Sequence, residues 1–140
     1  MKSVKEYIPH REPFLFVDQI IELNDDHVVT ELTVREDFEF FKGHYPSQPI
    51  MPGVLMCEAV FQSAGIYIAE LMKDDGSEKK TPILSKIGQA RFKRLVTPGE
   101  VIRMEIVPLE QKGPFFIMRG KTTNKAGEMV MNVEFTITAK

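Results

Sequence analysis

The C-terminal stretch of the chain has the most regular alternation of hydrophobic and polar residues. One side carries Met129, Met131, Val133, Phe135 and Ile137, and the other carries Asn132, Glu134, Thr136 and Thr138. A period of two is typical of a β-strand with one buried face. The pattern therefore predicts a strand over Glu128–Ala139 whose first set of side chains points into the core.

Five earlier stretches are also predicted to be strands, because hydrophobic residues gather there between short groups of turn-forming residues. In one of them, Ile102, Met104 and Ile106 fall on the same face. Such tight connections favour antiparallel neighbours. The predicted strands are Phe14–Leu23, Val28–Arg35, Pro82–Lys93, Val101–Gln111 and Phe115–Thr123, with turns at 24–26, 97–100, 112–114 and 124–127.

The stretch Val54–Met72 is hydrophobic nearly all round on the helical period, which predicts a helix of about 28 Å enclosed by protein. A membrane span is disfavoured, because Glu58 and Glu70 interrupt the stretch. One helix and about six strands predict an α+β fold in which an antiparallel sheet wraps around the helix. A helical turn is expected at Val4–Ile8, an irregular segment at Glu36–Pro49 and a charged loop at Lys73–Lys80.

Composition narrows the class of protein. With 140 residues, 43% of them hydrophobic, the chain is expected to form a single domain over residues 1–140. The formal net charge of -2 argues against nucleic acid as a partner. A lone Cys57 and the lack of an apolar leader after Met1 indicate a reducing, cytoplasmic location without stable membrane association.

The segment Gly43–Gln62 concentrates the residues capable of chemistry. It runs from His44 through a Pro-rich turn to Pro52, which is expected at the first helical position. The backbone N–H groups that follow, starting at Gly53, would point outward at the positive end of the helix dipole and could hold a developing oxyanion. Glu58 is expected to be buried and to share a stripe of the helix with Gln62 and with Gly65, where another backbone could approach.

Three blocks of sequence resemble the bacterial 3-hydroxyacyl-acyl carrier protein dehydratases. They are P-H-R-E-P-F-L-F-V-D at Pro9–Asp18, G-H-Y-P-S-Q-P-I-M-P-G-V-L-M-C-E-A-V-F-Q at Gly43–Gln62 and A-R-F-K-R-L-V-T-P-G-E at Ala90–Glu100. The resemblance implies a hot-dog fold and a homodimer that usually assembles into a trimer of dimers. It also implies dehydration of (3R)-3-hydroxyacyl thioesters, borne by acyl carrier protein, to trans-2-enoyl thioesters in type II fatty acid biosynthesis. The family's catalytic His and Glu fall on His44 and Glu58.

The residues fit the chemistry of this reaction. Neutral His44, with an ordinary pKa of about 6.5, can take the α-proton. The N–H groups of Gly53 and Val54 can hold the thioester oxygen, and Glu58, whose pKa desolvation should raise, can donate to the leaving hydroxyl. No metal or organic cofactor is required, and three scattered His with one Cys lack metal-ligand spacing.

Several residues are candidates for supporting roles. Gln62 is expected to orient Glu58, with simple packing as the alternative, and Pro52 to support the helix start. Phe61 replaces a small residue of the family and Tyr45 replaces a Phe, so both are candidates, with Leu55, to line the acyl pocket. Phe61 faces either the acyl channel or the sheet. The basic run Arg91, Lys93 and Arg94 is either a solvated strand face or a patch for an acidic carrier protein.

Other interpretations stay open at this point. A hot-dog thioesterase would hydrolyse the thioester with an activated water, and a non-catalytic module would only bind acyl chains. The same dehydration also serves lipid A precursors and specialised lipid or polyketide pathways, on protein or coenzyme A carriers. His10 with Arg11 either braces the site or forms a structural turn. Cys57 is expected to be a small buried hydrophobe rather than a nucleophile, and His27 a solvent-facing hairpin residue.

Overall fold

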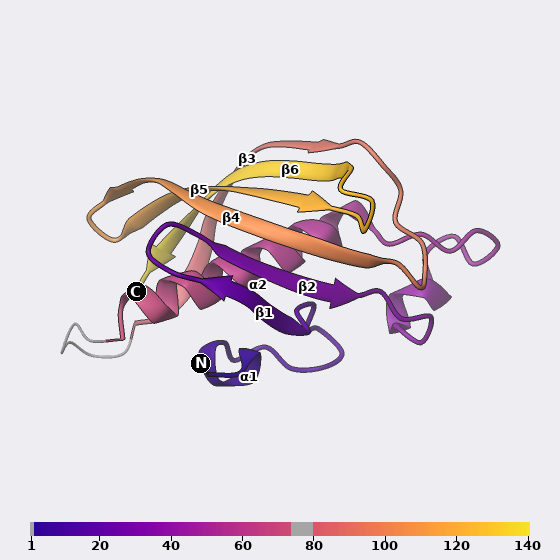
Figure 1. The fold of residues 1–140 in the computed structure, drawn as a ribbon, viewed down its shortest axis with the longest axis horizontal. Helices are drawn as coiled ribbons and strands as arrows, with labels where there is room; N and C mark the ends of the chain where they lie inside the picture. Colours follow the sequence, from indigo (N-terminus) through magenta and orange to yellow (C-terminus); the bar gives the residue numbers. More distant parts are fainter. Residues whose placement is uncertain (1, 74–79) are drawn as a thin grey trace.

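The computed structural model describes residues 2–73 and 80–140, in which six antiparallel strands curve around one long helix (Figure 1). The helix and sheet predicted from the sequence are thus confirmed. In chain order the elements are α1 (Val4–Tyr7), β1 (Gln19–Leu23), β2 (Val28–Thr33), the 3-10 helix η1 (Glu39–Lys42), α2 (Gly53–Leu71), β3 (Pro82–Phe92), β4 (Val101–Lys112), β5 (Phe115–Thr123) and β6 (Met129–Ala139).

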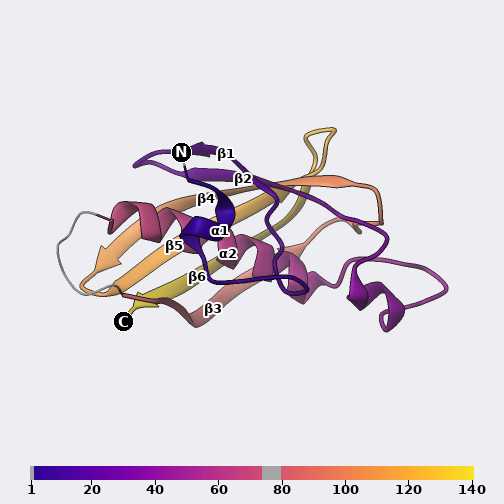
Figure 2. The ribbon, with the colours of Figure 1, turned by 90° about the horizontal axis from the view of Figure 1, so that it is seen from below.

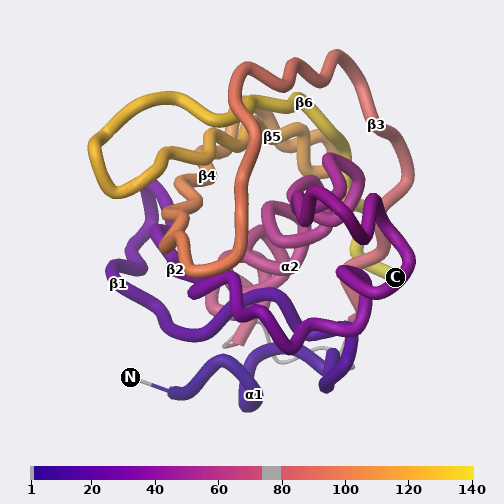
Figure 3. The backbone as a smooth tube through the Cα atoms, turned by 90° about the vertical axis from the view of Figure 1, so that its right-hand side faces the viewer, coloured from indigo at the N-terminus to yellow at the C-terminus, as the bar shows by residue number. Residues whose placement is uncertain are grey.

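The strands follow the order β1-β2-β4-β5-β6-β3 across the sheet, and every neighbouring pair is antiparallel. The segment that contains α2 leads from β2 to β3. Strand β3 lies at the edge of the sheet opposite β1. In the end-on view the strands arch around α2, while α1 and the segment after it lie on the open side (Figure 3). This arrangement is the hot-dog fold that the resemblance implied.

The core lies between α2 and the concave face of the sheet. Ile102, Met104 and Ile106 on β4 are fully buried, as their spacing predicted. On β6 the predicted inward residues Met131, Val133, Phe135 and Ile137 are buried, and Met129 is partly buried. The prediction for Thr138 was wrong. Its side chain is buried because its hydroxyl donates a hydrogen bond of 2.8 Å to Ser85 on β3.

The helix α2 is long and apolar enough to cross a membrane by composition, but about two thirds of it (67%) is buried inside the protein. It lies very close to the sheet at Gly120 of β5. A Cβ atom built there would lie 2.3 Å from Cγ1 of Val60, which no real contact allows. The helix is therefore a core element, as expected, and a glycine lets it lie directly on β5.

The N-terminal segment packs along α2 on the open side of the sheet (Figure 2). The predicted helical turn is present as α1, and the hydroxyl of Tyr7 donates to Glu70 near the end of α2. A Cβ atom at Gly65 would lie 3.3 Å from a methyl group of Ile8. At Gly65 the sequence led us to expect the approach of another backbone, but the atom that comes close belongs to the side chain of Ile8, in the segment following α1.

One predicted boundary was wrong in this region. The first strand begins at Gln19 rather than at Phe14, because the backbone groups of Phe14 and Phe16 bind the side chain of Gln62. The segment predicted to be irregular contains the short 3-10 helix η1. Most of the loop predicted at Lys73–Lys80 lies outside the described residues.

Candidate active site

His44 lies in the loop between η1 and α2, with its ring oriented by the backbone. Its Nδ1 atom is 3.1 Å from the carbonyl oxygen of Ile50. A carbonyl oxygen only accepts, so Nδ1 must carry the proton and donate. In the neutral ring, Nε2 then holds the lone pair and is the basic atom.

A tight turn after His44 fixes this loop. Tyr45 has a φ of 48°, in the left-handed region that bulky residues rarely adopt, and its carbonyl accepts the N–H of Gln48 at 2.9 Å. Farther along, the N–H of Met51 donates to the carbonyl of Val96 at 2.8 Å. The loop is therefore closed on itself and attached to the chain before β4. Strained backbone conformations of this kind gather at functional sites.

The start of α2 differs from the prediction by one residue. Pro52 has an extended ψ of 135° and caps the helix, whereas Gly53 is the first helical residue. The carbonyl of Pro52 accepts the N–H groups of Leu55 and Met56. Within the described part of the chain, the N–H groups of Gly53 and Val54 have no hydrogen-bond partner. Two donors at the positive end of the dipole are thus available to an oxyanion.

Phe92, at the end of β3, packs on the helix start and was missed from the sequence. A Cβ atom at Gly53 would lie 3.0 Å from its ring, so only glycine fits there without displacing the ring. The Phe92 side chain is itself 49% exposed. No local pattern could have placed this ring against Gly53, because the two residues are far apart in the chain.

Glu58 lies in the second turn of α2 and was expected to be buried. Its side chain is instead 21% exposed in the single chain. Its Oε2 atom accepts a hydrogen bond of 3.0 Å from Nε2 of Gln62, one helical turn later. The carboxylate is therefore held by the protein at one oxygen and reaches the surface.

Gln62 connects Glu58 to the N-terminal segment. Its Nε2 also donates to the carbonyl of Phe14 at 2.7 Å, and its Oε1 accepts the N–H of Phe16 at 2.8 Å. The Gln62 residue is only 1% exposed, so these bonds are shielded from water. The contact with Glu58 is the one that the helical spacing indicated, while the orienting role of Gln62 stays a prediction.

His10 and Arg11 have separate tasks, where the sequence left bracing and a structural turn as alternatives for both. Arg11 donates to the carbonyls of Lys5, Ile8 and His10, which makes it the structural residue of the turn. The ring of His10 reaches the site instead, with Nε2 at 3.6 Å from Oε2 of Glu58.

The structure brings Glu58, Gln62 and His10 together but does not pair Glu58 with His44. Among the described residues, no hydrogen bond or ion pair joins the two predicted catalytic side chains.

Cys57 is buried. Its burial raises the pKa of its thiol, and the nearby charge of Glu58 raises it further. A raised pKa keeps the thiol protonated, which fits the packing role expected for Cys57.

The predicted pocket residues lie in different environments. Phe61 is buried, and its ring centroid is 4.9 Å from that of Phe135 on β6, so it faces the sheet. Leu55 is partly buried, and Tyr45 is exposed, with its ring 4.7 Å from that of His44. None of these contacts tests the predicted role in binding an acyl chain.

The basic run at the end of β3 is exposed. Arg91, Lys93 and Arg94 all face solvent, and Arg94 forms an ion pair of 2.7 Å with Glu128.

His27 is less exposed than expected, because its ring lies between Glu22 at 3.3 Å and Glu105 at 3.2 Å. In the described part of the chain, no group of three or more His, Cys, Asp or Glu side chains could hold a metal ion.

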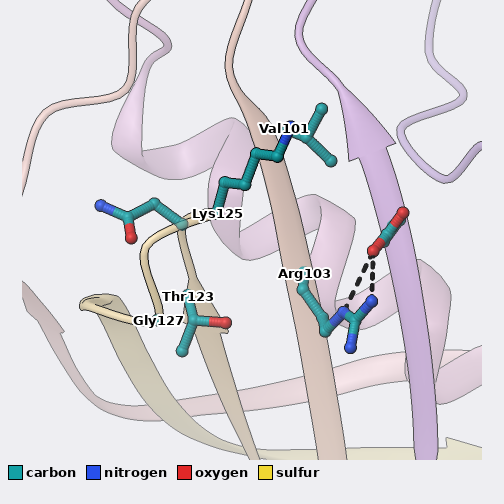
Figure 4. Close-up of a pocket in the computed structure, with 7 residues that line it drawn as sticks. Val101, Arg103, Thr123, Lys125 and Gly127 are labelled. Carbon is teal, nitrogen blue, oxygen red and sulfur yellow. Dashed lines mark hydrogen bonds and ion pairs between the residues drawn. The ribbon is translucent and has the colours of Figure 1, made fainter.

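A separate groove of about 490 Å³ contains none of the predicted catalytic residues (Figure 4). It is lined by residues of β2, β4, the end of β5 and the turn between β5 and β6. Arg103 donates to Glu31 from Nε at 3.1 Å and from Nη2 at 2.5 Å. These hydrogen bonds lower the pKa of the Glu31 carboxyl below its usual value. The Arg103 charge is thus already balanced by Glu31.

Comparison with known proteins places the chain in a family. The FabA-like domain family matches residues 8–134. The chain is 41% identical over 137 residues to the 3-hydroxyacyl-acyl-carrier-protein dehydratase FabZ of Clostridium acetobutylicum, covering 97% of this chain and 94% of that protein. It is 37% identical over 141 residues to FabZ of Oceanobacillus iheyensis, covering 100% and 98%.

Solved structures share the fold at lower sequence identity. The dehydratase heterocomplex ApeI:P from Xenorhabdus doucetiae matches with a TM-score of 0.82 and 21% identity, over 100% of this chain and 92% of that one. A hypothetical thioesterase with coenzyme A from Streptococcus pneumoniae matches with a TM-score of 0.68 and 16% identity, over 87% and 84%. The family match and the near full-length similarity to two FabZ proteins show that this chain belongs to the FabA-like family and is FabZ-like.

Proposed function

We propose that this protein is a hydro-lyase that converts (3R)-3-hydroxyacyl thioesters, carried by acyl carrier protein, to trans-2-enoyl thioesters in fatty acid biosynthesis. The observation that carries the proposal is the orientation of His44, whose Nδ1 is tied to the carbonyl of Ile50. This leaves Nε2 as a base in a chain that resembles FabZ proteins over nearly its whole length. We place the enzyme in the cytoplasm, in keeping with the single unpaired cysteine.

In this mechanism His44 Nε2 removes a proton from the α-carbon of the substrate. The negative charge that develops on the thioester oxygen is held by the N–H groups of Gly53 and Val54. Contacts of this type are typically worth about 3–4 kcal/mol in the transition state. Glu58 donates a proton to the β-hydroxyl, the carbon–oxygen bond breaks, and water leaves as the double bond forms. His44 gains one proton and Glu58 loses one, so exchange with solvent restores both.

The active site in this proposal is shared between two copies of the chain. His44 and Glu58 have different partners within one chain, which fits a site where His44 of one protomer faces Glu58 of the other. Strand β3 offers the edge for such a dimer. It pairs only with β6 among the described strands, and Ile83 and Ile87 on it are about half exposed. An unpaired apolar edge of this kind is suited to pairing across a twofold axis.

Further assembly into a trimer of dimers, and docking of the carrier protein at Arg91, Lys93 and Arg94, belong to the same proposal. Arg91 lies near the end of β3, Lys93 and Arg94 follow the strand, and all three flank Phe92, whose ring packs on Gly53 at the start of α2. An acidic carrier that docked here would deliver its thioester close to the start of α2. Arg94 is partly neutralised by Glu128, so Arg91 and Lys93 would contribute most to the attraction.

The test is incubation with a series of 3-hydroxyacyl carrier proteins of increasing chain length, with mass spectrometry of the products. We expect loss of one water molecule from the acyl group and no free carrier thiol. Release of free thiol would instead identify a thioesterase, and binding without either product would identify an acyl-binding module. His44→Ala and Glu58→Gln should each lower the rate by about 10²–10⁴ while folding normally. Near wild-type turnover in either variant would reject the proposed roles.

A further inference from the structure

We propose that His10 is a positioning residue that fixes the orientation of the Glu58 carboxyl group. The inference rests on the proposed function, because it assigns Glu58 the role of acid. It adds a residue from the N-terminal segment to a site otherwise built from the loop around His44 and from α2.

Two nitrogen atoms converge on the same oxygen of Glu58. Oε2 accepts from Nε2 of Gln62 at 3.0 Å, and Nε2 of His10 lies 3.6 Å from it. Oε1 has no hydrogen-bond partner among the described residues. The carbonyl oxygen of a neutral carboxyl group is its stronger acceptor, so with two nitrogen atoms facing Oε2 we infer that the acid proton sits on Oε1. The arrangement thus selects Oε1 as the atom that serves the substrate.

Gln62 cannot reverse this selection by rotating its amide. Its Nε2 donates to the carbonyl of Phe14 and its Oε1 accepts the N–H of Phe16, both at less than 3 Å. Swapping the amide would break both bonds in a buried place. Gln62 therefore always presents an N–H to Glu58, and Oε2 always accepts it.

The surroundings of His10 fix which nitrogen of its ring is protonated. Nδ1 is buried and has no hydrogen-bond partner among the described residues, while Nε2 faces the carboxylate. A proton on Nδ1 would be an unpaired buried donor and would turn the Nε2 lone pair toward Oε2, which is itself an acceptor. The neutral ring therefore carries its proton on Nε2. A small rotation from 3.6 Å brings this N–H into hydrogen-bond range of Oε2.

The backbone around His10 is held firmly enough for such a role. The guanidinium of Arg11 donates to the carbonyls of Ile8 at 2.9 Å, His10 at 2.7 Å and Lys5 at 3.0 Å. Ile8 packs against Gly65 on α2, and the segment is held again at Phe14 and Phe16. His10 thus lies between two points of attachment to the helix that carries Glu58.

Kinetics on variants of the full-length protein test the proposal. His10→Phe keeps a ring but removes the N–H, and we expect kcat to fall about 10- to 100-fold, the range for leaving one shielded hydrogen-bonding group without its partner. KM should change little, and His10→Gln, which restores an N–H donor, should recover most of the lost rate. In the Glu58→Gln background, His10→Phe should cause no further loss, because His10 acts through Glu58.

His27→Phe is the matched control. This histidine also contacts two carboxylates but lies in the hairpin between β1 and β2, so kcat should stay unchanged. Wild-type kcat in His10→Phe, with Glu58→Gln inactive, would overturn the His10 proposal alone. Wild-type activity of Glu58→Gln would overturn the proposed function together with it. If the fall in kcat of the double variant His10→Phe/Glu58→Gln equals the product of the falls in the two single variants, action of His10 through Glu58 is also rejected.

A spectroscopic measurement covers the case in which His10→Phe does not fold. The ¹⁵N spectrum of the imidazole rings distinguishes a proton on Nε2 from one on Nδ1. We expect the neutral His10 ring of the wild-type protein to carry its proton on Nε2, and its signals to shift in Glu58→Gln while those of His27 stay in place. A proton on Nδ1, or His10 signals unchanged by Glu58→Gln, would contradict the proposal.

Discussion

The side-chain oxygen of Gln62 accepts the backbone N–H of Phe16 at 2.8 Å, which ties the middle of α2 to the N-terminal segment. The same amide donates to the carbonyl of Phe14 and to Glu58. One buried side chain therefore completes the backbone hydrogen bonds of a neighbouring segment and holds the acid. If Glu58 is the acid, as proposed, stability and catalysis are coupled at Gln62.

Gln62→Leu should show that coupling. The substitution leaves the Phe16 N–H and the Phe14 carbonyl without partners, and an unsatisfied buried group costs about 1–3 kcal/mol. Chemical denaturation should report a loss in this range or above, and the dehydration rate should fall because Oε2 of Glu58 loses a donor. Gln111→Leu, an exposed position on β4, should change the stability by less than about 0.5 kcal/mol. A stable Gln62→Leu protein with full activity would contradict the orienting role.

Mixing of two inactive variants tests whether the active site is shared. His44→Ala and Glu58→Gln homodimers each lack one group at both sites, whereas a hybrid dimer has one site with both groups intact. We expect the mixture to regain up to about half of the wild-type rate per hybrid dimer, since one of its two sites is complete. Subunit exchange must be followed with a label, such as a fluorophore pair on the two variants. Complete exchange with no recovered activity would mean that both groups act within one chain.

Phe61→Ala separates a packing role from a role in the acyl channel. The Phe61 ring packs against Phe135 in the core, and removing a buried Phe side chain typically costs about 3–5 kcal/mol. We expect a large drop in stability by thermal or denaturant unfolding and no change in chain-length preference. Phe115→Ala, at a half-exposed ring, is the control and should cost much less. A preference shifted to longer acyl chains with little loss of stability would place Phe61 in the channel.

The pair of Glu31 and Arg103 predicts a pH-dependent contribution to stability. Hydrogen bonds from Arg103 lower the folded-state pKa of Glu31 below its ordinary value of 4.5. The pair therefore stabilises the fold above pH 4.5 and loses its effect as the pH falls through the lower folded-state pKa. Because Arg103 is half exposed, the effect at neutral pH should be at most about 1 kcal/mol.

Denaturation of Arg103→Met and wild type at several pH values measures this contribution. The difference in the free energy of unfolding between wild type and Arg103→Met should become smaller as the pH is lowered from about 7 toward about 3. Added salt should also narrow it at neutral pH, because it screens exposed charges. Arg119→Met removes a cation that forms no ion pair within the described residues, and it should show no such pH dependence. A constant difference across the pH range would exclude the ion pair as its cause.

Regular periodicity explains which parts of the fold could be predicted. Ile102, Met104 and Ile106 alternate on one strand, and the stretch after Gly53 is apolar all round, so burial followed directly from spacing. Thr138 and the segment at Phe14 did not follow the pattern. In both places a hydrogen bond to a residue distant in the chain, Ser85 or Gln62, decided the local structure.

The same distinction applies to the candidate site. The approach of Gln62 to Glu58 follows from one turn of helix, and the orientation of His44 depends on Ile50, a few residues along the same loop. His10 reaches Glu58 only because the N-terminal segment folds back along α2, and Phe92 reaches Gly53 only because β3 ends there. Contacts within one element could be predicted, and contacts between distant elements required the three-dimensional structure.

The close contact between Val60 and Gly120 fixes the position of α2 along its own axis. On the same face of β5, the neighbours of Gly120 are Met118 and Thr122, both buried and both bearing side chains. If α2 slid along the strand in either direction, Val60 would collide with one of them, so only one placement is open to it. Because Glu58 stands two residues before Val60, this one glycine in the sheet also fixes where along β5 the Glu58 carboxylate lies.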